Sequence, residues 1–488
     1  MDRPNILLIT TDQQRFDTIH ALGNRHIYTP HLNWLADEGV AFERCYSDSP
    51  VCMAARATIM TGRHGYNHGL TDNSSDKRPM DPARTLPGVL TRYGYQTRAQ
   101  GKMHFAPIRA NYGFEHMELP MDYYRAMAEG PGADIPKAHG VGENEIEPVI
   151  STVDETKSAT YWTVKRSVDF LETRDDTRPF FLWTSFAKPH PPFDPCRNYW
   201  ELYRDKKLPP PVVGGWAEDP ANAPQGFYQS TYVLNNAYRM SDEQLLDVKR
   251  AYYACITQID YSLGLLFARM REMDLFDNTW IFFTSDHGDL MGDHHMCAKS
   301  VFLEGSAHIP MLVRPPQPAH PLRGARCGAL VTLADLAPTI LAATGIECPA
   351  ETDGLDMMAL AADADAGGVD ADAGGARAGR KDRTFYGNCG NTYFAVMEDG
   401  YKYLWTAYGG DELLFYLPDD PMERKDLAKV KPEITQRMKS KLIEQVSGYN
   451  ASLVHNGELV THAAIKGPGD VNKWPGFHST VVLSDVLH

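Results

Sequence analysis

One short run of residues combines a thiol, a guanidinium group and small side chains at helical spacing. It reads Cys52-Met53-Ala54-Ala55-Arg56-Ala57-Thr58-Ile59-Met60-Thr61-Gly62-Arg63. The alanines favour a helix and let a substrate approach closely, and Arg56 follows Cys52 by one helical turn. We expect Cys52 at a helix N-terminus, where backbone N–H groups and the helix dipole favour an anion and lower the pKa of a thiol. A buried, unreactive cysteine is the competing interpretation.

Two acidic clusters each follow an apolar run. They read Thr11-Asp12-Gln13-Gln14 and Ser285-Asp286-His287-Gly288-Asp289. Hard divalent cations prefer oxygen ligands at rigid positions, which Asp12, Gln13 and Asp286 offer, and His287 adds a nitrogen donor. Taken alone, an aspartate after a strand is more often a helix cap or a turn residue. The clusters therefore indicate a metal site or two ordinary strand ends.

Further cationic and imidazole groups occur in three other segments, and a fourth segment offers an amide. Gly101-Lys102-Met103-His104 places an amine and an imidazole on the same side of an extended chain. His190 stands in the proline-stiffened run Lys188-Pro189-His190-Pro191-Pro192-Phe193, which limits its conformational freedom. Lys299 is the last residue of the run Cys297-Ala298-Lys299, and Asn73 is the last residue of Thr71-Asp72-Asn73. Each residue alone has an ordinary interpretation as a solvated or turn residue.

The run that begins at Cys52 resembles the signature of type I sulfatases. In that family a cysteine followed by x-(Pro/Ala)-x-Arg and then by Thr-Gly-Arg is oxidised to formylglycine. The matching residues are Cys52, Ala54, Arg56, Thr61, Gly62 and Arg63. The resemblance implies that Cys52 becomes formylglycine and that a maturing enzyme is a partner. Ala54, where proline is commoner, is associated with the anaerobic radical maturation route.

The resemblance also implies a metal site. One divalent cation, calcium before magnesium or manganese, would be held by Asp12, Gln13, Asp286 and His287. Gln13 and His287 stand where many relatives have Asp and Asn. A second site of the zinc type, built from Asp289, His294 and His295, is disfavoured because the surrounding segment resembles that of sulfatases with one metal ion.

The remaining motifs receive roles from the same resemblance. Arg56 and Lys102 would steady the formylglycine oxygen, and His104 would act as the base during sulfate release. The residues His190 and Lys299 would contact the sulfate and its leaving oxygen, and Asn73 would contact the substrate. The implied reaction starts when a hydroxyl of hydrated formylglycine attacks sulfur and ends when its second hydroxyl is deprotonated and free sulfate leaves.

Two alternatives remain at this point. Phosphonate monoester and phosphodiester hydrolases of the same superfamily share formylglycine, the metal and the Asp-Gln start, but carry Tyr and Thr near the positions of Lys102 and His104. A non-enzymatic protein that merely binds anions would keep Cys52 as a thiol. We expect a sulfatase for a small sulfate monoester, and the phosphonate hydrolase is the alternative.

The elements that must position these residues are predicted from apolar runs that alternate with helical patterns. The runs span Asn5–Thr10, Phe180–Ser185, Thr279–Ser285 and Ile309–Arg314. This alternation predicts an α/β fold with a largely parallel sheet, whose strand ends carry the candidate residues. The resemblance implies an alkaline-phosphatase-like fold, with a large mixed, mainly parallel sheet sandwiched by helices and a smaller C-terminal antiparallel sheet plus helix.

The C-terminal third differs in composition. We predict a catalytic domain over residues 1–375, with an Ala/Gly/Asp-rich loop or linker at 361–380, and a small α+β subdomain over 381–460. In the subdomain, short strands precede a helix over Pro432–Gly448 whose apolar stripe is Ile434, Met438, Leu442 and Val446. Residues 461–488 predict an extended tail, either a disordered end or a strap that joins subunits in a homo-oligomer.

Bulk properties limit the partners. The chain has 488 residues and a net charge of −15, which disfavours nucleic acid, anionic membranes and long polyanions. Its eight cysteines show no CxxC pairs, and the N-terminal apolar run is too short for a signal peptide or a membrane span. We therefore expect a cytoplasmic enzyme acting on a small-molecule sulfate ester, with the alcohol held by loops at 112–148 and 198–240.

Overall fold

One mixed sheet organises most of the chain. The computed structural model describes residues 3–73, 80–129, 134–219, 222–229, 240–316, 320–366 and 383–464. Within them the sheet has nine strands in the order β4-β3-β5-β1-β6-β8-β2-β7, with β9 beside β2. The strands are β1 (Asn5–Asp12), β2 (Val40–Tyr46), β3 (Gln96–Gly101), β4 (His116–Glu118), β5 (Phe180–Pro189), β6 (Thr279–Ser285), β7 (His308–Ile309), β8 (Met311–Arg314) and β9 (Ala325–Thr332).

Parallel pairing dominates this sheet. Strand β1 lies between β5 and β6 and is parallel to both, and β3 is parallel to β4 and β5. Strands β7 and β8 run antiparallel to β2. The single strand predicted over Ile309–Arg314 is divided at Pro310, because proline has no N–H for the ladder. The predicted mixed, mainly parallel sheet is confirmed.

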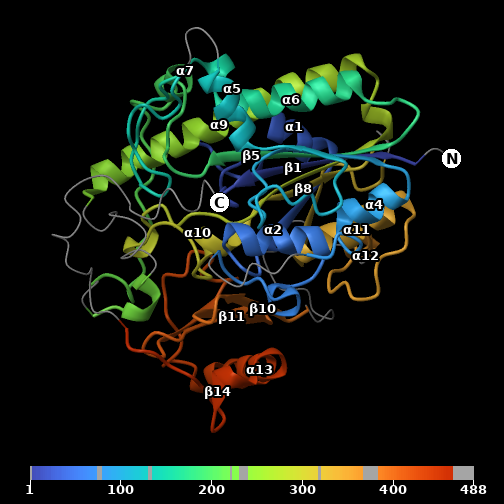
Figure 1. Cartoon of the computed structure of the whole chain (residues 1–488). Helices are drawn as coiled ribbons and strands as arrows, with labels where there is room; N and C mark the ends of the chain where they lie inside the picture. Colours follow the sequence, from blue (N-terminus) through green and yellow to red (C-terminus); the bar gives the residue numbers. More distant parts are fainter. Residues whose placement is uncertain are drawn as a thin grey trace.

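Helices cover both faces of the sheet (Figure 1). One face carries α1 (Pro30–Glu38), α6 (Ala159–Thr173) and α9 (Asp242–Glu272), and the other carries α2 (Cys52–Thr61), α4 (Leu86–Arg92), α11 (Leu336–Thr344) and α12 (Met357–Ala366). Strand β1 shows why both faces are needed. Leu7 packs toward the first group of helices and Leu8 toward the second, and both are fully buried.

Shorter helices lie in the connections. They are α3 (Gly65–His68), α5 (Pro120–Ala128), α7 (Arg197–Glu201) and α10 (Glu304–Ala307). The longest helix, α9, begins with a capping box in which Ser241 and Gln244 satisfy each other's backbone N–H groups. No described helix combines the length and the apolar character needed to cross a bilayer.

A second, antiparallel sheet follows the first. Its strands are β10 (Phe385–Cys389), β11 (Tyr393–Glu398), β12 (Tyr401–Thr406) and β13 (Glu412–Tyr416). Helix α13 (Pro432–Tyr449) packs on one face through Met438, Leu442 and Val446, as predicted, with Ile434 partly buried beside them. The opposite face packs against the large domain around Phe302. A hairpin of β14 (Val454–His455) and β15 (Glu458–Leu459) completes this lower part of Figure 1.

The Ala/Gly/Asp-rich segment differs from the prediction at its start. We expected a loop or linker from residue 361, but α12 continues to Ala366. Alanine has the highest helix propensity, and Met357 and Ala361 pack into the core. The rest of that segment, 367–380, lies outside the described residues, as does the tail from 465 onward. The linker and the subunit strap therefore stay predictions.

Candidate active site

The predicted site residues come together where parallel strands end. Asp12 is the last residue of β1, Asp286 follows β6, and Lys102 follows β3. Neighbouring parallel strands place their carboxyl ends at one edge of the sheet, which explains how distant residues meet. Cys52 is the first residue of α2, as predicted, and Gly62 ends that helix in the left-handed conformation.

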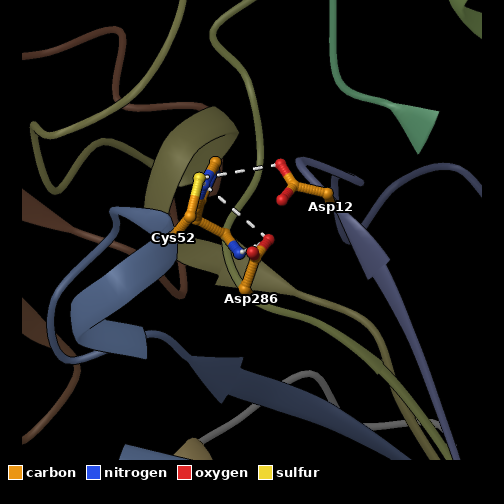
Figure 2. Close-up of side chains that lie close together, drawn as sticks. Asp12, Cys52 and Asp286 are labelled. Atoms are coloured by element: carbon orange, nitrogen blue, oxygen red, sulfur yellow. Dashed lines mark hydrogen bonds and ion pairs between the residues drawn. The ribbon is translucent and has the colours of Figure 1, made fainter. Parts of the chain in front are cut away.

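A thiol, two carboxylates and an imidazole form the centre of the site. One ligand atom from each of Asp12, Cys52, Asp286 and His287 lies within 4.8 Å of the others, and all four side chains are buried. The Cys52 Sγ is 3.2 Å from His287 Nε2 and 3.8 Å from Asp12 Oδ1. Figure 2 shows Cys52, at the start of α2, facing the carboxylates of Asp12 and Asp286.

Arg56 and Lys102 neutralise the carboxylates. The Arg56 guanidinium contacts Asp12 Oδ2 at 3.2 Å and Asp286 Oδ2 at 3.0 Å, and the whole side chain is buried. The Lys102 Nζ lies 2.8 Å from Asp12 Oδ2. Both cations contact the Oδ2 atom of Asp12, whereas the Cys52 thiol contacts its Oδ1, so their predicted action on the formylglycine oxygen stays a prediction.

Sequence reasoning missed the hydroxyl that holds these two cations. Ser185 Oγ accepts from Arg56 Nη1 at 2.8 Å and from Thr10 Oγ1 at 2.9 Å, and it donates to the Lys102 carbonyl at 2.5 Å. Thr10 in turn accepts from the indole N–H of Trp183 at 2.8 Å. The run around Ser185 predicts a buried strand, and nothing in that run indicates that one serine makes several hydrogen bonds. Strand pairing of Thr10 with Ser185 creates the network.

A second chain of contacts joins Lys299 to the thiol. Its Nζ lies 2.7 Å from Gln13 Oε1, 2.9 Å from His190 Nε2 and 3.8 Å from Cys52 Sγ. The Gln13 amide also donates to Asp289 Oδ2 at 2.5 Å. In this structure the Gln13 side chain therefore positions Lys299, so its predicted role as a metal ligand stays a prediction.

His104 and Asn73 border the same space. His104 adopts a positive φ of 52°, and its Nδ1 is buried with no hydrogen-bond partner among the described residues. A buried polar atom without a partner is rare in folded proteins and calls for an explanation, such as a function or a bound group. The Asn73 Oδ1 accepts from the backbone N–H of Met53 at 3.0 Å, so Asn73 supports the first turn of α2 as well as lining the space.

The surrounding cations make the thiol acidic. Burial and Asp12 act to raise the pKa of Cys52, yet Lys299, Lys102 and His287 lower it well below the usual range. Burial alone would likewise raise the pKa of Asp12, but Lys102 and other neighbouring cations hold it well below its usual range. The site is therefore built to hold negative charge at the position of Cys52.

His190 and Asp286 shift in the opposite sense. Burial, together with Lys299 and Lys102, holds the pKa of His190 well below its usual range, so its Nε2 can accept a hydrogen bond from Lys299. Burial and the nearby Asp12 raise the pKa of Asp286 to about 6. Two carboxylates this close repel each other unless a cation lies between them.

The donor set fits a hard divalent cation. Asp12 and Asp286 offer carboxylate oxygens and His287 offers its Nε2, the atom that contacts Cys52. The Nδ1 of His287 lies 3.0 Å from the Gly288 carbonyl, an arrangement that orients the ring. A cation at this place would offset the repulsion between the carboxylates. The geometry thus agrees with the implied metal site, and the identity of the ion stays open.

A cavity of about 600 Å³ opens above the thiol. The residues that line it at this end, which we call the floor, include the predicted catalytic residues Cys52, Lys102, His104, His190 and Lys299. Its outer wall comes from the segments at 108–124, 136–160 and 187–194 and from the end of β10. The first prediction for the alcohol pocket, loop 112–148, contributes to this wall, whereas the predicted loop at 198–240 is not part of the described lining.

Comparison with known sequences decides the family. The family profile described as Sulfatase matches residues 4–346, and the profile described as N-sulphoglucosamine sulphohydrolase, C-terminal, matches residues 292–448. The chain belongs to the sulfatase family. As a member of this family, which lies in the alkaline phosphatase superfamily, it is a sulfuric ester hydrolase.

Individual relatives agree over nearly the whole length. The chain is 31% identical to an arylsulfatase of Clostridium perfringens, covering 94% of this chain and 97% of the relative. It is 28% identical to a choline-sulfatase of Rhizobium meliloti, covering 88% and 83%. The solved phosphonate monoester hydrolase of Agrobacterium radiobacter superposes with a TM-score of 0.71 at 24% identity, covering 92% and 96%, and shares the fold.

Proposed function

We propose that this enzyme hydrolyses small sulfate monoesters at Cys52 after its conversion to formylglycine. In the overall reaction, water and the ester give the alcohol and inorganic sulfate, and a proton is released. The observation that carries the proposal is the setting of Cys52. It lies at a helix N-terminus on the floor of a cavity, within 3.8 Å of Lys299 and beside the Asp12–Asp286 pair.

Formylglycine, once formed and hydrated, would supply the nucleophilic hydroxyl that a thiol lacks. A divalent cation, calcium before magnesium or manganese, would polarise oxygens at the floor of the cavity when held by Asp12, Asp286 and His287, with Gln13 as the predicted fourth ligand. Side chains of the protein would bind the sulfate group and transfer the protons.

One cation and one neutral imidazole would hold the sulfate group. Lys299 would bind the sulfuryl oxygens and carries the proton that the departing alcohol oxygen needs, and His190, whose Nε2 accepts from Lys299, would orient that ammonium beside the sulfate. Arg56 and Lys102, anchored by Ser185, hold Asp12 in place and keep the floor cationic. Preorganised charges of this kind stabilise the charge that develops as the ester bond breaks.

His104 is the base in this proposal. Its Nδ1 has no hydrogen-bond partner in the described part of the chain, and its ring borders the cavity beside Lys102. It would take the proton that must leave before free sulfate is released. Asn73 would touch the ester from the opposite side while holding the first turn of α2.

A phosphonate monoester hydrolase is the alternative, because the Asp12-Gln13 start and the fold are shared with that group of enzymes. Lys102 and His104 favour the sulfatase, since they supply a cation and a base to the floor.

We further propose a maturing enzyme that acts on Cys52, a cytoplasmic location and a homo-oligomer formed through the tail.

The test compares two substrates that share one alcohol. Phenyl sulfate and the phenyl monoester of a phosphonate are assayed with metal-replete protein, and released sulfate and phenol are measured. We expect the sulfate ester to be turned over with the higher kcat/KM. A reversed order would assign the enzyme to the alternative, and turnover of neither ester would reject the proposed reaction for both.

A further inference from the structure

The cavity above Cys52 has two ends of different chemistry. The floor carries Lys102 and Lys299, whereas the outer wall combines an apolar and aromatic surface with polar groups and ion pairs. The apolar side chains on it include Ile108, Leu119, Met121, Tyr123, Tyr124 and Tyr393. An alcohol attached to the sulfate must lie against this wall, because the sulfate itself occupies the floor.

Two polar side chains of the outer wall, Ser158 and Gln258, already have partners within the chain. Ser158 Oγ caps α6 by accepting from the N–H of Tyr161 at 3.2 Å and also accepts from Gln258 Nε2 at 3.2 Å. Gln258 Oε1 accepts from the N–H of Cys196 at 3.0 Å. Binding a polar alcohol would require these bonds to be exchanged for new ones, at little net gain.

The charged groups of the wall form closed ion pairs. Lys137 pairs with Glu143, and Lys188 pairs with Asp194. Each of the four side chains is at least three-quarters buried. Other charged residues that line the cavity are Lys102 and Lys299 at the floor and Asp72 beside Gly390. The outer end thus presents neither a free cation nor a free anion from these pairs.

We propose that the outer wall selects an uncharged alcohol with an aromatic or otherwise apolar surface, and that the Lys137–Glu143 pair is the specificity-determining element that disfavours charged alcohols. This inference rests on the proposed sulfatase function and goes beyond it. Lys137 Nζ lies 5.5 Å from the centroid of the Tyr124 ring, so the pair sits directly at the aromatic wall. Breaking the pair leaves one buried charge facing the alcohol.

The test changes the charge of the wall without touching the floor. Lys137→Met leaves the Glu143 carboxylate without its cation, and Lys137→Met/Glu143→Gln removes both charges and serves as the matched control. The ratio of kcat/KM for choline sulfate, whose alcohol is cationic, to that for phenyl sulfate is measured in each protein. We expect the wild type to prefer phenyl sulfate, Lys137→Met to raise the ratio by about tenfold or more, and the double variant to return close to the wild-type ratio.

Two results would overturn the inference. One is a wild type that prefers choline sulfate, and the other is a ratio that Lys137→Met leaves unchanged while phenyl sulfate is still hydrolysed. Failure of the underlying sulfatase function is distinguishable, because then neither ester would release sulfate with any of the three proteins. Circular dichroism and thermal unfolding of each variant show that the comparison is made between folded proteins.

Discussion

Two of the buried charge clusters among the described residues are built differently. The first joins the large domain to the C-terminal sheet through Lys402 on β12. Its Nζ lies 2.8 Å from Glu304 Oε1 and 2.9 Å from Glu423 Oε1, and Glu304 Oε2 lies 2.6 Å from His308 Nδ1. Tyr46 adds a hydroxyl at 3.0 Å from Glu304 Oε1. We call these five residues the Lys402 cluster.

The active site is the second cluster. Arg56 and Lys102 pair with carboxylates, but the Lys299 Nζ lies beside the uncharged side chains of Gln13 and His190 and beside the Cys52 thiol. None of Lys402, Glu304 and Glu423 lines the cavity, whereas Lys102, Lys299 and Cys52 do. The paired, enclosed charges of the Lys402 cluster hold two layers of the fold together, whereas Lys299 lies at a cavity and is placed to meet an incoming anion.

The largest expected effect follows the replacement of Cys52, and Cys389, a second cysteine at the same cavity, serves as the control. Cys52→Ala should lower sulfate release by more than about 10³-fold, because no nucleophile remains. Cys389→Ala, the matched control, should keep most activity, since burial raises the pKa of Cys389 to about 12 and leaves it a thiol. Initial rates and thermal unfolding of both variants are compared. Equal losses in the two variants would remove the distinction.

The next prediction compares one substitution in each cluster for its effect on stability and on kcat. Lys402→Met leaves Glu304 and Glu423 buried without their cation and should lower the free energy of unfolding by about 3 to 5 kcal/mol. Lys102→Met should cost less stability, because Arg56 still neutralises Asp12, but should lower kcat by about 10²-fold or more. Urea unfolding and steady-state kinetics are measured for each.

One result would contradict this separation of the two clusters. If Lys402→Met lowered kcat of the folded protein as much as Lys102→Met does, the Lys402 cluster would belong to the catalytic machinery. Kinetics are therefore measured at a temperature well below the unfolding midpoint of the weaker variant.

A smaller effect concerns Ser185, which positions both cations of the floor. Ser185→Ala removes the acceptor for Arg56 and the donor to the Lys102 carbonyl, so we expect kcat to fall by about tenfold with KM less affected. Ser185→Thr should rescue part of the loss because it keeps the hydroxyl. Thr184→Val is the control, as the Thr184 hydroxyl bonds to Ser167. A purely structural role would lower stability and leave kcat unchanged.

The smallest effect is a pH dependence of stability in the Lys402 cluster. Burial alone would raise the pKa of Glu304, but Lys402 and His308 lower it to about 2 from 4.5. Its contribution is therefore present above pH 4.5 and is lost as the pH falls toward 2. Burial raises the pKa of Glu423 from 4.5 to about 7, so its contribution is lost as the pH rises from 4.5 through 7.

Urea unfolding between pH 3 and pH 8 measures the acid limb, where stability is lost below pH 4.5, separately from the limb between pH 4.5 and 7. Glu304→Gln should flatten the acid limb, and Glu423→Gln should flatten the limb between pH 4.5 and 7. Identical curves for the two variants would show that neither carboxyl has the environment described here.

The fold could be predicted from the sequence, and so could the residues that gather at the candidate site, because their signals are local. The buried strand at Asn5–Thr10 is a continuous apolar run, and the small residues after Cys52 favour a helix start. The ends of parallel strands then had to bring Asp12 and Asp286 together. The C-terminal sheet followed from short strands separated by Gly-containing turns.

Contacts between distant segments could not be predicted in this way. The hydrogen bonds of Ser185 depend on its register with Thr10, and the Lys137–Glu143 pair lies where Lys137 contacts Tyr124 of α5. The start of the Ala/Gly/Asp-rich segment was expected as a loop because its composition is polar and small. Its alanines instead extend α12, where Met357 and Ala361 are buried in the core. Tertiary packing decided each of these three cases.

The chemical state of Cys52 in active protein tests the central claim most directly. Enzyme expressed with a formylglycine-maturing partner is digested, and the peptide that contains Cys52 is examined by mass spectrometry alongside its sulfate release. We predict that sulfur is replaced by an aldehyde oxygen at this residue and that activity rises in proportion to the converted fraction. Full activity in protein whose Cys52 is entirely thiol would contradict the account.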